Sequence, residues 1–173
     1  MKLFGEGHGT LLEIGAGFGV NREYFPEACR YLALEPEDAF HHRLSQVADK
    51  VIHAHAENTG LSPESVDTVV CCMVLCSVPD LGAALREIER VLKPGGTLLL
   101  MEHVGAPRGS LLRFFQQMCS PLSGRLAHGC RPDRDTGMAL RSVALGLVRE
   151  EHFTLQFHAP LIRDWLSAKL LKQ

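Results

Sequence analysis

The chain lacks the sequence features of membrane, nucleic-acid-binding and secreted proteins. Among its 173 residues, 18 Lys and Arg stand against 20 Asp and Glu, so the net charge of −2 offers no basic surface for a nucleic acid. Apolar runs all fall well short of the roughly 20 residues of a membrane-spanning helix, and the start is too short and polar for a secretory signal. We therefore expect a soluble, cytoplasmic protein with no integral membrane segment and no nucleic-acid partner.

The cysteines also lack the paired C-x₂-C spacing that is typical of a zinc site. Six are present, at positions 29, 71, 72, 76, 119 and 130, and several lie within apolar runs, where a cysteine behaves as a small hydrophobe. Because no secretory signal precedes them, reduced thiols are expected rather than disulfides. The spacing therefore predicts no metal site.

A glycine-rich turn is the most informative feature that is present. Residues 10–19 form a short apolar run that breaks into Gly15, Gly17 and Gly19, and the next apolar run ends at the acidic Glu35. Glycines let a backbone adopt positive φ and approach a ligand closely, and an acid at the end of the next strand can accept hydrogen bonds from ribose hydroxyls. The spacing is G-x-G-x-G, which argues against the dinucleotide motif G-x-G-x-x-G.

Strand and helix patterns alternate through the first two thirds of the chain. Strands are predicted at 11–14, 31–34, 51–54, 66–72 and 97–104, and helices at 20–25, 37–48 and from Asp80 to the 93–96 turn. The last of these helices has a buried stripe at Leu81, Leu85, Ile88 and Leu92. This order predicts an α/β fold with a doubly wound, mostly parallel sheet.

The final third is less regular. Helices are predicted at 111–119 and 137–146, a loop at 121–133, and a closing pair of strands at 148–158 and 165–171. Leu111, Phe114, Phe115 and Met118 have helical spacing and are predicted to be core residues; the alternative is that part of this cluster lines an apolar substrate cavity or touches a membrane surface. No linker or repeat divides the chain, so we expect one domain over 1–173, with a cofactor-binding core at 10–104 and substrate-side helices and closing strands at 105–173.

The glycine turn occurs together with Glu35, an Ala56-Glu57 pair, the strand at 66–70 and a Lys-Pro-Gly-Gly turn at 93–96. In this combination, residues 10–104 resemble the class I S-adenosylmethionine-dependent methyltransferases. The resemblance implies a Rossmann-like sheet of seven strands with a reversed C-terminal strand, and S-adenosylmethionine as the cofactor.

The resemblance also implies a set of cofactor-binding residues. Glu13, Gly15, Ala16 and Gly17 are expected at the methionine end of the cofactor, and Glu35 and Pro36 at the ribose. Ala56 and Glu57 are expected beside the adenine, and Cys71 and Cys72 at the strand end that faces the cofactor. Many relatives carry Asp where this chain has His55, so the adenine contact is expected to shift to a backbone carbonyl or to Glu57. Only nine residues precede Thr10, so either the cofactor site is unusually open or the reading frame begins late.

Residues 69–78, 101–104, 128–130 and 134–136 resemble one subgroup, which includes alkyl-thiol S-methyltransferases. That resemblance implies a small-molecule substrate, with an apolar thiol as the most specific expectation. Two alternatives remain: C-, O- or N-methylation of a quinone-like or lipid-like acceptor, and a catalytically silent cofactor-binding domain. The oligomeric state is not determined by the sequence.

Four residues outside the cofactor set are candidates for chemistry on the acceptor. His103 lies at the carboxyl end of a predicted strand, where ligands of open α/β sheets bind, and an imidazole with a pKa near ~6.5 suits proton transfer at neutral pH. We therefore expect His103 to be the catalytic residue that accepts the thiol proton; the alternative is that it only shapes the pocket. Cys76, Ser77 and Cys130 are candidate substrate contacts, with tight packing as their alternative role.

Overall fold

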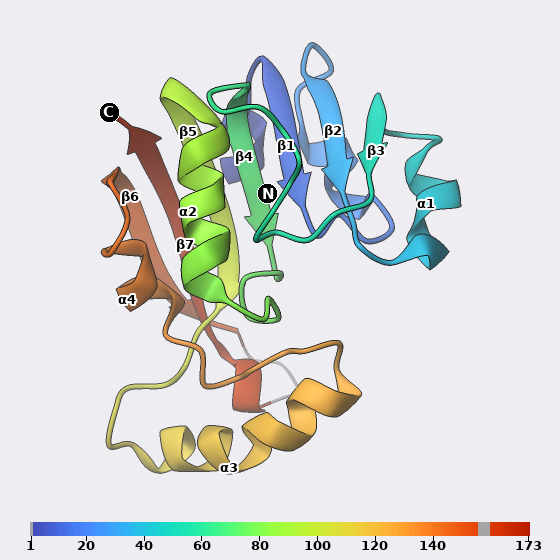
Figure 1. Cartoon of the computed structure of the whole chain (residues 1–173). Coiled ribbons are helices and arrows are strands. Elements are labelled where there is room, and N and C mark those ends of the chain that lie inside the picture. Colours follow the sequence, from blue (N-terminus) through green and yellow to red (C-terminus); the bar gives the residue numbers. More distant parts are fainter. Residues whose placement is uncertain (1, 156–159) are drawn as a thin grey trace.

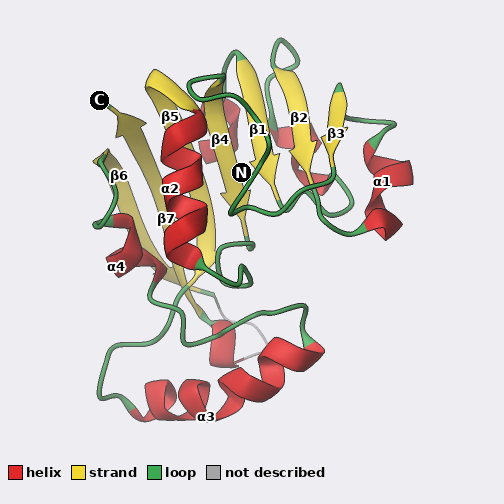
Figure 2. Cartoon of the chain, viewed as in Figure 1, coloured by secondary structure: helices red, strands yellow, loops and turns green. Residues whose placement is uncertain are grey.

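The computed structural model describes residues 2–155 and 160–173 (Figures 1 and 2). The helical elements in chain order are η1 (Leu3–Glu6), η2 (Val20–Tyr24), α1 (Asp38–Leu44), α2 (Leu81–Val91), α3 (Leu111–Leu126), α4 (Thr136–Leu140) and η3 (Pro160–Ile162). The strands are β1 (Thr10–Ile14), β2 (Arg30–Leu34), β3 (Lys50–Ile52), β4 (Val66–Cys72), β5 (Leu92–His103), β6 (Leu145–Thr154) and β7 (Asp164–Lys172).

All seven strands form one sheet in the order β3-β2-β1-β4-β5-β7-β6. The first five pair in parallel, and β7 lies antiparallel between β5 and β6. The predicted sheet, with its reversed C-terminal strand, is therefore confirmed. Because β1 is followed by β2 on one side and flanked by β4 on the other, the strand order reverses at β1/β4, and ligands of open α/β sheets bind at such a point.

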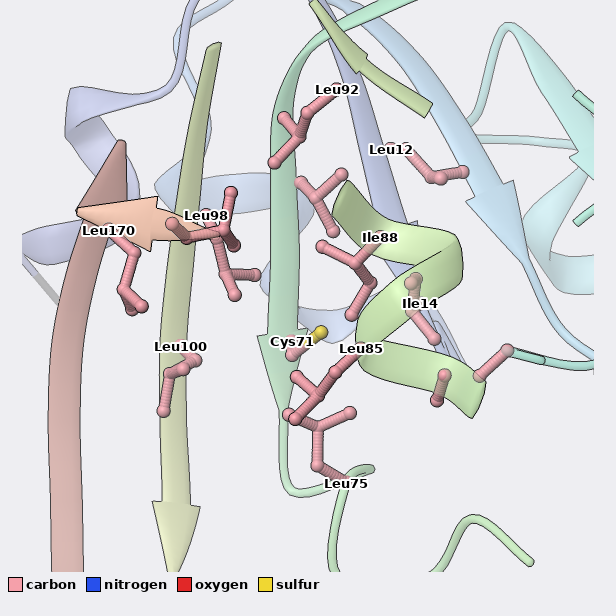
Figure 3. Close-up of a cluster of buried hydrophobic side chains, with 14 of the residues drawn as sticks. Leu12, Ile14, Cys71, Leu75, Leu85, Ile88, Leu92, Leu98, Leu100 and Leu170 are labelled. Atoms are coloured by element: carbon pink, nitrogen blue, oxygen red, sulfur yellow. The ribbon is translucent and has the colours of Figure 1, made fainter. Parts of the chain in front are cut away.

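The sheet has a hydrophobic core on each face. On one face, α2 lies across β4 and β5, and Leu85 and Ile88 point toward side chains of the strands beneath (Figure 3). The other face packs Phe4 of η1 against Phe25, Tyr31 and Leu44. The strands between the cores are buried on both sides, which explains their nearly continuous apolar sequence.

The helix α2 forms in the predicted segment, and Leu85 and Ile88 of its predicted stripe are buried, but Leu81 is only half-buried and Leu92 is the first residue of β5. Asp80 is the N-cap, and its side chain accepts from the Ala83 N–H at 2.9 Å. The helix ends at Val91, one residue before β5, and the 93–96 turn makes an irregularity in the pairing of β5 with β4. Gly95 has φ +76°, a left-handed conformation that glycine adopts easily.

Two predictions about α3 are wrong. The helix does not stop at 119 but runs to Leu126 through Pro121, so the following loop begins at Ala127, six residues later than expected. The predicted core residues are exposed: Leu111 by 73%, Phe114 by 55%, Phe115 by 47% and Met118 by 63%.

The face of α3 that is turned inward is polar. The Gln116 amide accepts from the Ala106 N–H at 2.8 Å and donates to the Leu161 carbonyl at 2.8 Å. Arg113 donates to the Asp135 carboxylate at 3.2 Å. Hydrogen bonds to the flanking loops, rather than apolar packing, therefore decided which face of this helix is buried.

The last elements differ from prediction at their ends. The helix expected at 137–146 stops at Leu140, because the chain from Leu145 onward pairs with β7. The expected strand at 148–158 is β6, which begins earlier, at Leu145; residues 156–158 of that prediction lie outside the described residues. Within residues 2–155 and 160–173, no helix is long and apolar enough to cross a membrane.

Candidate functional site

A cleft of about 440 Å³ opens at the carboxyl ends of β1, β2 and β4. It lies where the strand order reverses, and its size is in the range of small-ligand sites. Six of the residues that the sequence nominated line it: Gly15, Glu35, Pro36, Ala56, Glu57 and Ser77. A larger cleft of about 640 Å³ lies beside β6 and α4, and none of the nominated cofactor residues line it.

The glycine turn brings the end of β1 against the chain that follows β4. Gly15 has φ +66°, and its N–H donates to the Leu34 carbonyl at 2.8 Å. A Cβ on Gly15 would lie 2.4 Å from Cγ2 of Val74, whereas a Cβ on Gly17, at φ +53°, would meet nothing within 4 Å. Gly15 is therefore required for close packing as well as for its backbone conformation, and Gly17 for its conformation alone.

Glu35 connects the glycine turn to the start of α1. Its Oε2 accepts from the Gly17 N–H at 2.8 Å, and its Oε1 accepts from the Glu37 N–H at 3.1 Å. A carboxylate has about four acceptor positions, so two amide donors leave others for hydroxyl groups in the cleft. Glu35 is 6% exposed, so its carboxylate is held in a fixed orientation at the cleft wall.

Glu13 does not line the cleft. Its carboxylate is buried, accepting from Asn21 Nδ2 at 2.7 Å and from the Tyr31 hydroxyl. Burial raises the pKa of Glu13, while the hydrogen bonds from Tyr31 and Asn21 oppose that rise. Glu13 thus joins β1 to β2 and η2, and acts on the cleft by holding the glycine turn in place.

Ala16 and Cys71 are buried in the two hydrophobic cores, and Cys72 packs partly buried against one of them. Burial raises the pKa of the Cys71 thiol far above its usual value and that of Cys72 to about 12. Both thiols are therefore neutral at physiological pH. Neither lines the cleft, which leaves the strand-end backbone as the part of these residues that can face a ligand.

The segment after β3 forms the opposite wall. His55, Ala56 and Glu57 line the cleft there. Glu57 Oε1 accepts from the Asp80 N–H at 3.0 Å. This contact fixes the position of the wall relative to the start of α2.

Glu102, on β5, was not nominated from the sequence, yet it shapes the turn after β4. Its buried carboxylate accepts from the N–H groups of Val74, Leu75 and Cys76 at 2.8, 2.9 and 3.4 Å. Burial raises the pKa of Glu102, and these amide donors lower it. The only signal in the sequence was an acidic residue inside an otherwise apolar strand.

The structure brings together three residues that the sequence nominated separately, namely Cys76, His103 and Cys130. Their ligand atoms, the two Sγ atoms and one imidazole nitrogen, lie within 4.8 Å of one another, and His103 Nε2 is 3.2 Å from Cys130 Sγ. Hydrogen bonds from Cys76 and His103 hold the pKa of Cys130 below its usual value, and the same thiol–thiol contact, with burial, raises that of Cys76. We call these three residues the sulfur–imidazole cluster.

Another cleft, of about 450 Å³, adjoins the 440 Å³ cleft under α3. The two clefts share Ser77, Val78, Pro79 and Gly129. A Cβ on Gly129 would lie 2.6 Å from the Ser77 carbonyl oxygen, so the loop after α3 passes directly over the turn after β4. Sequence reasoning missed His128 and Gly129 as lining residues; a glycine inside the polar loop was the available signal.

Comparison with known proteins agrees with this geometry. The profile of a family described as a methyltransferase domain matches residues 12–100. Rat thiol S-methyltransferase TMT1B is 37% identical over 136 residues, which cover 73% of this chain and 56% of that protein. Human thiol S-methyltransferase TMT1A is 33% identical over 172 residues, which cover 94% of this chain and 70% of that protein. The chain thus spans only part of the length of these relatives.

Solved structures share the fold at lower identity. The YcgJ protein of Bacillus subtilis has a TM-score of 0.76 at 16% identity, covering 96% of this chain and 92% of that one. An S-adenosylmethionine-dependent methyltransferase of Thermotoga maritima has a TM-score of 0.69 at 22% identity, with coverages of 97% and 83%. The fold, the matched family profile and the relatives agree: the chain belongs to the class I S-adenosylmethionine-dependent methyltransferases.

Proposed function

We propose that this methyltransferase transfers the methyl group of S-adenosylmethionine to the sulfur of a small apolar thiol. The observation that carries the proposal is the sequence similarity of this chain to a human thiol S-methyltransferase, which is 33% identical across 94% of the chain. A second support is the position of the sulfur–imidazole cluster, because Ser77 and Gly129, chain neighbours of Cys76 and Cys130, line both clefts.

The cofactor is placed in the 440 Å³ cleft. Glu35 is assigned to the ribose hydroxyls, because its two amide donors leave acceptor positions for a diol, which can donate two hydrogen bonds. The glycine turn is assigned to the methionine end, and Ala56 with Glu57 to the adenine. Glu13, Ala16, Cys71 and Cys72 support these contacts from behind the cleft wall.

The acceptor is placed in the adjoining cleft. Methyl transfer from a sulfonium is an in-line displacement, so the protein contributes alignment and control of the sulfur's charge. A free thiol has a pKa near ~8.5, so the acceptor needs only mild activation. Cys76 and His103 are buried and Cys130 is half-buried, with His103 Nε2 against Cys130 Sγ. The acceptor is therefore expected to approach the cluster from the Cys130 side.

Cofactor binding is tested first, by calorimetry with S-adenosylhomocysteine. The wild type is expected to bind, and Glu35→Ala to bind more weakly, while Glu27→Gln, a change of an exposed acid before β2, is expected to bind like the wild type. One charge-assisted hydrogen bond contributes about 1.5–3 kcal/mol, so each lost ribose contact is expected to lower the affinity for S-adenosylhomocysteine by about 10- to 150-fold. Absence of binding by the wild type would support a catalytically silent domain instead.

The acceptor is then identified by mass detection of methylated products. Alkyl and aryl thiols, phenols, amines and quinone-like carbon acceptors of similar size are compared at equal concentration. We expect thioethers from the apolar thiols and little product from the oxygen and nitrogen acceptors. Methylation of a phenol, an amine or a quinone-like carbon acceptor without methylation of any thiol would refute the proposal.

A further inference from the structure

We propose that Cys76, His103 and Cys130 form a zinc site whose fourth position is open to the sulfur of the methyl acceptor. The part of this inference that concerns the acceptor rests on the proposed thiol methylation. The metal site itself rests on the geometry of the three side chains.

The three ligand atoms lie close enough together for one zinc ion to reach them all after small movements. They all lie within 4.8 Å of one another. With Zn–S bonds of ~2.3 Å and Zn–N bonds of ~2.0 Å, tetrahedral ligand atoms are about 3.5–3.8 Å apart. The 3.2 Å between His103 Nε2 and Cys130 Sγ therefore needs to widen by only about 0.3 Å, to the ~3.5 Å of a sulfur–nitrogen pair.

The backbone around the ligands is held in place. Glu102 accepts from the N–H of Cys76, and the Arg131 N–H donates to the Cys76 carbonyl at 3.0 Å, which joins the two loops that carry the cysteines. His103 is at the end of β5, in register with Trp165 of β7. The three ligands therefore come from backbone segments that pairing and hydrogen bonds hold in place, while the second ring nitrogen of His103, Nδ1, is buried without a hydrogen-bond partner among the described residues.

The ligand set favours zinc and an open site. Two thiolates and an imidazole are soft and borderline ligands that select zinc, and three protein ligands are typical of catalytic rather than structural zinc. Within residues 2–155 and 160–173, the cluster includes no fourth Cys, His, Asp or Glu ligand. The nearby Glu102 carboxylate accepts from three backbone N–H groups, which hold it against the turn after β4.

Such a site activates the acceptor without a dedicated base. On binding zinc, the acceptor thiol releases its proton to water and becomes a thiolate. A lone pair of that sulfur forms the new bond to the methyl carbon, while the bond from the methyl carbon to the sulfonium sulfur breaks and leaves its electron pair on S-adenosylhomocysteine. The product is a neutral thioether, which binds zinc more weakly than a thiolate and can leave.

The metal site is tested by elemental analysis of the full chain after incubation with zinc chloride and dialysis. One zinc ion per chain is expected in the wild type. Cys76→Ser, Cys130→Ser and His103→Gln should each weaken binding by at least about 100-fold, because loss of an outer contact alone costs 10–100-fold. The matched control is His53→Ala, which disrupts the exposed group of Asp38, His41 and His53 and should leave zinc content unchanged.

S-adenosylhomocysteine binding shows whether each variant is folded, because the cofactor is assigned to other residues. Retained zinc in a Cys76→Ser/Cys130→Ser double variant, substoichiometric zinc in the wild type, or loss of zinc in His53→Ala would overturn the metal site.

The open position is tested with cobalt(II) in place of zinc. Addition of an apolar thiol should change the cobalt absorption spectrum, and the matching thioether should not. A spectrum that the thiol leaves unchanged would overturn the open position. Neither measurement needs methyl transfer, so a chain that binds zinc and thiol but yields no thioether would refute the proposed function alone.

Discussion

Alanine substitutions at Gly15 and Gly17 test the packing of the glycine turn beside the 440 Å³ cleft. Both residues have positive φ, at +66° and +53°. An alanine in the left-handed region costs about 1–2 kcal/mol, and both variants bear this cost. Only at Gly15 does the added Cβ meet another atom, Cγ2 of Val74 at 2.4 Å. Overpacking of this kind adds about 1–3 kcal/mol.

The expected losses of stability are therefore about 1–2 kcal/mol for Gly17→Ala and about 2–5 kcal/mol for Gly15→Ala. For a chain of this size, each kcal/mol lowers Tm by about 2–4 °C. Differential scanning fluorimetry is thus expected to show a decrease of about 2–8 °C for Gly17→Ala and a larger one for Gly15→Ala. Urea unfolding gives the same comparison as free energies.

A second-site change separates the clash from the backbone strain. Val74→Ala removes the methyl group at 2.4 Å but leaves its own Cβ at 2.9 Å from the new side chain. We therefore expect Val74→Ala to recover part of the stability lost in Gly15→Ala and none of that lost in Gly17→Ala. Equal losses in the two glycine variants, or no recovery with Val74→Ala, would refute this account.

Three further outcomes follow from other contacts. Glu102→Gln replaces a carboxylate that accepts from three backbone N–H groups, and is expected to lower the free energy of unfolding by about 1–3 kcal/mol in urea titrations. Burial raises the pKa of Glu87, but hydrogen bonds from Arg90 and Thr59 outweigh it and lower the pKa to about 2. Because the folded-state pKa is lowered, the ionised Glu87 stabilises the fold above the usual pKa near 4.5, and this stabilisation is lost as the pH falls toward 2. Over that pH range, the free energy of unfolding of the wild type should therefore fall by about 3 kcal/mol more than that of Glu87→Gln. Asp80→Ala removes the cap of α2 and is expected to lower Tm by about 2–4 °C.

Each of these has an outcome that contradicts it. Unchanged urea stability in Glu102→Gln would mean that the turn after β4 does not depend on the carboxylate. If the free energy of unfolding falls equally in the wild type and in Glu87→Gln as the pH is lowered, Glu87 does not contribute to the pH dependence of stability. A Tm of Asp80→Ala equal to that of the wild type would show that packing alone, without the cap, stabilises α2.

The sequence alone determined the features that depend on neighbours along the chain. The glycine turn, the cap at Asp80 and the apolar stripe of α2 are short-range patterns, because backbone conformation and helical periodicity act over a few residues. The parallel strands were predictable for the same reason, since each is a short apolar run bounded by turns. The family resemblance then added the reversed C-terminal strand, which pairing of β7 with β5 confirms.

Only the tertiary structure decided where long-range partners meet. Spacing along the chain predicted no metal site, since Cys76, His103 and Cys130 are far apart in sequence and converge only through the sheet and the loop after α3. The inward face of α3 was likewise set by polar partners in distant loops, such as Leu161 for Gln116. Side-chain convergence depends on the path of the whole chain, which no local pattern encodes.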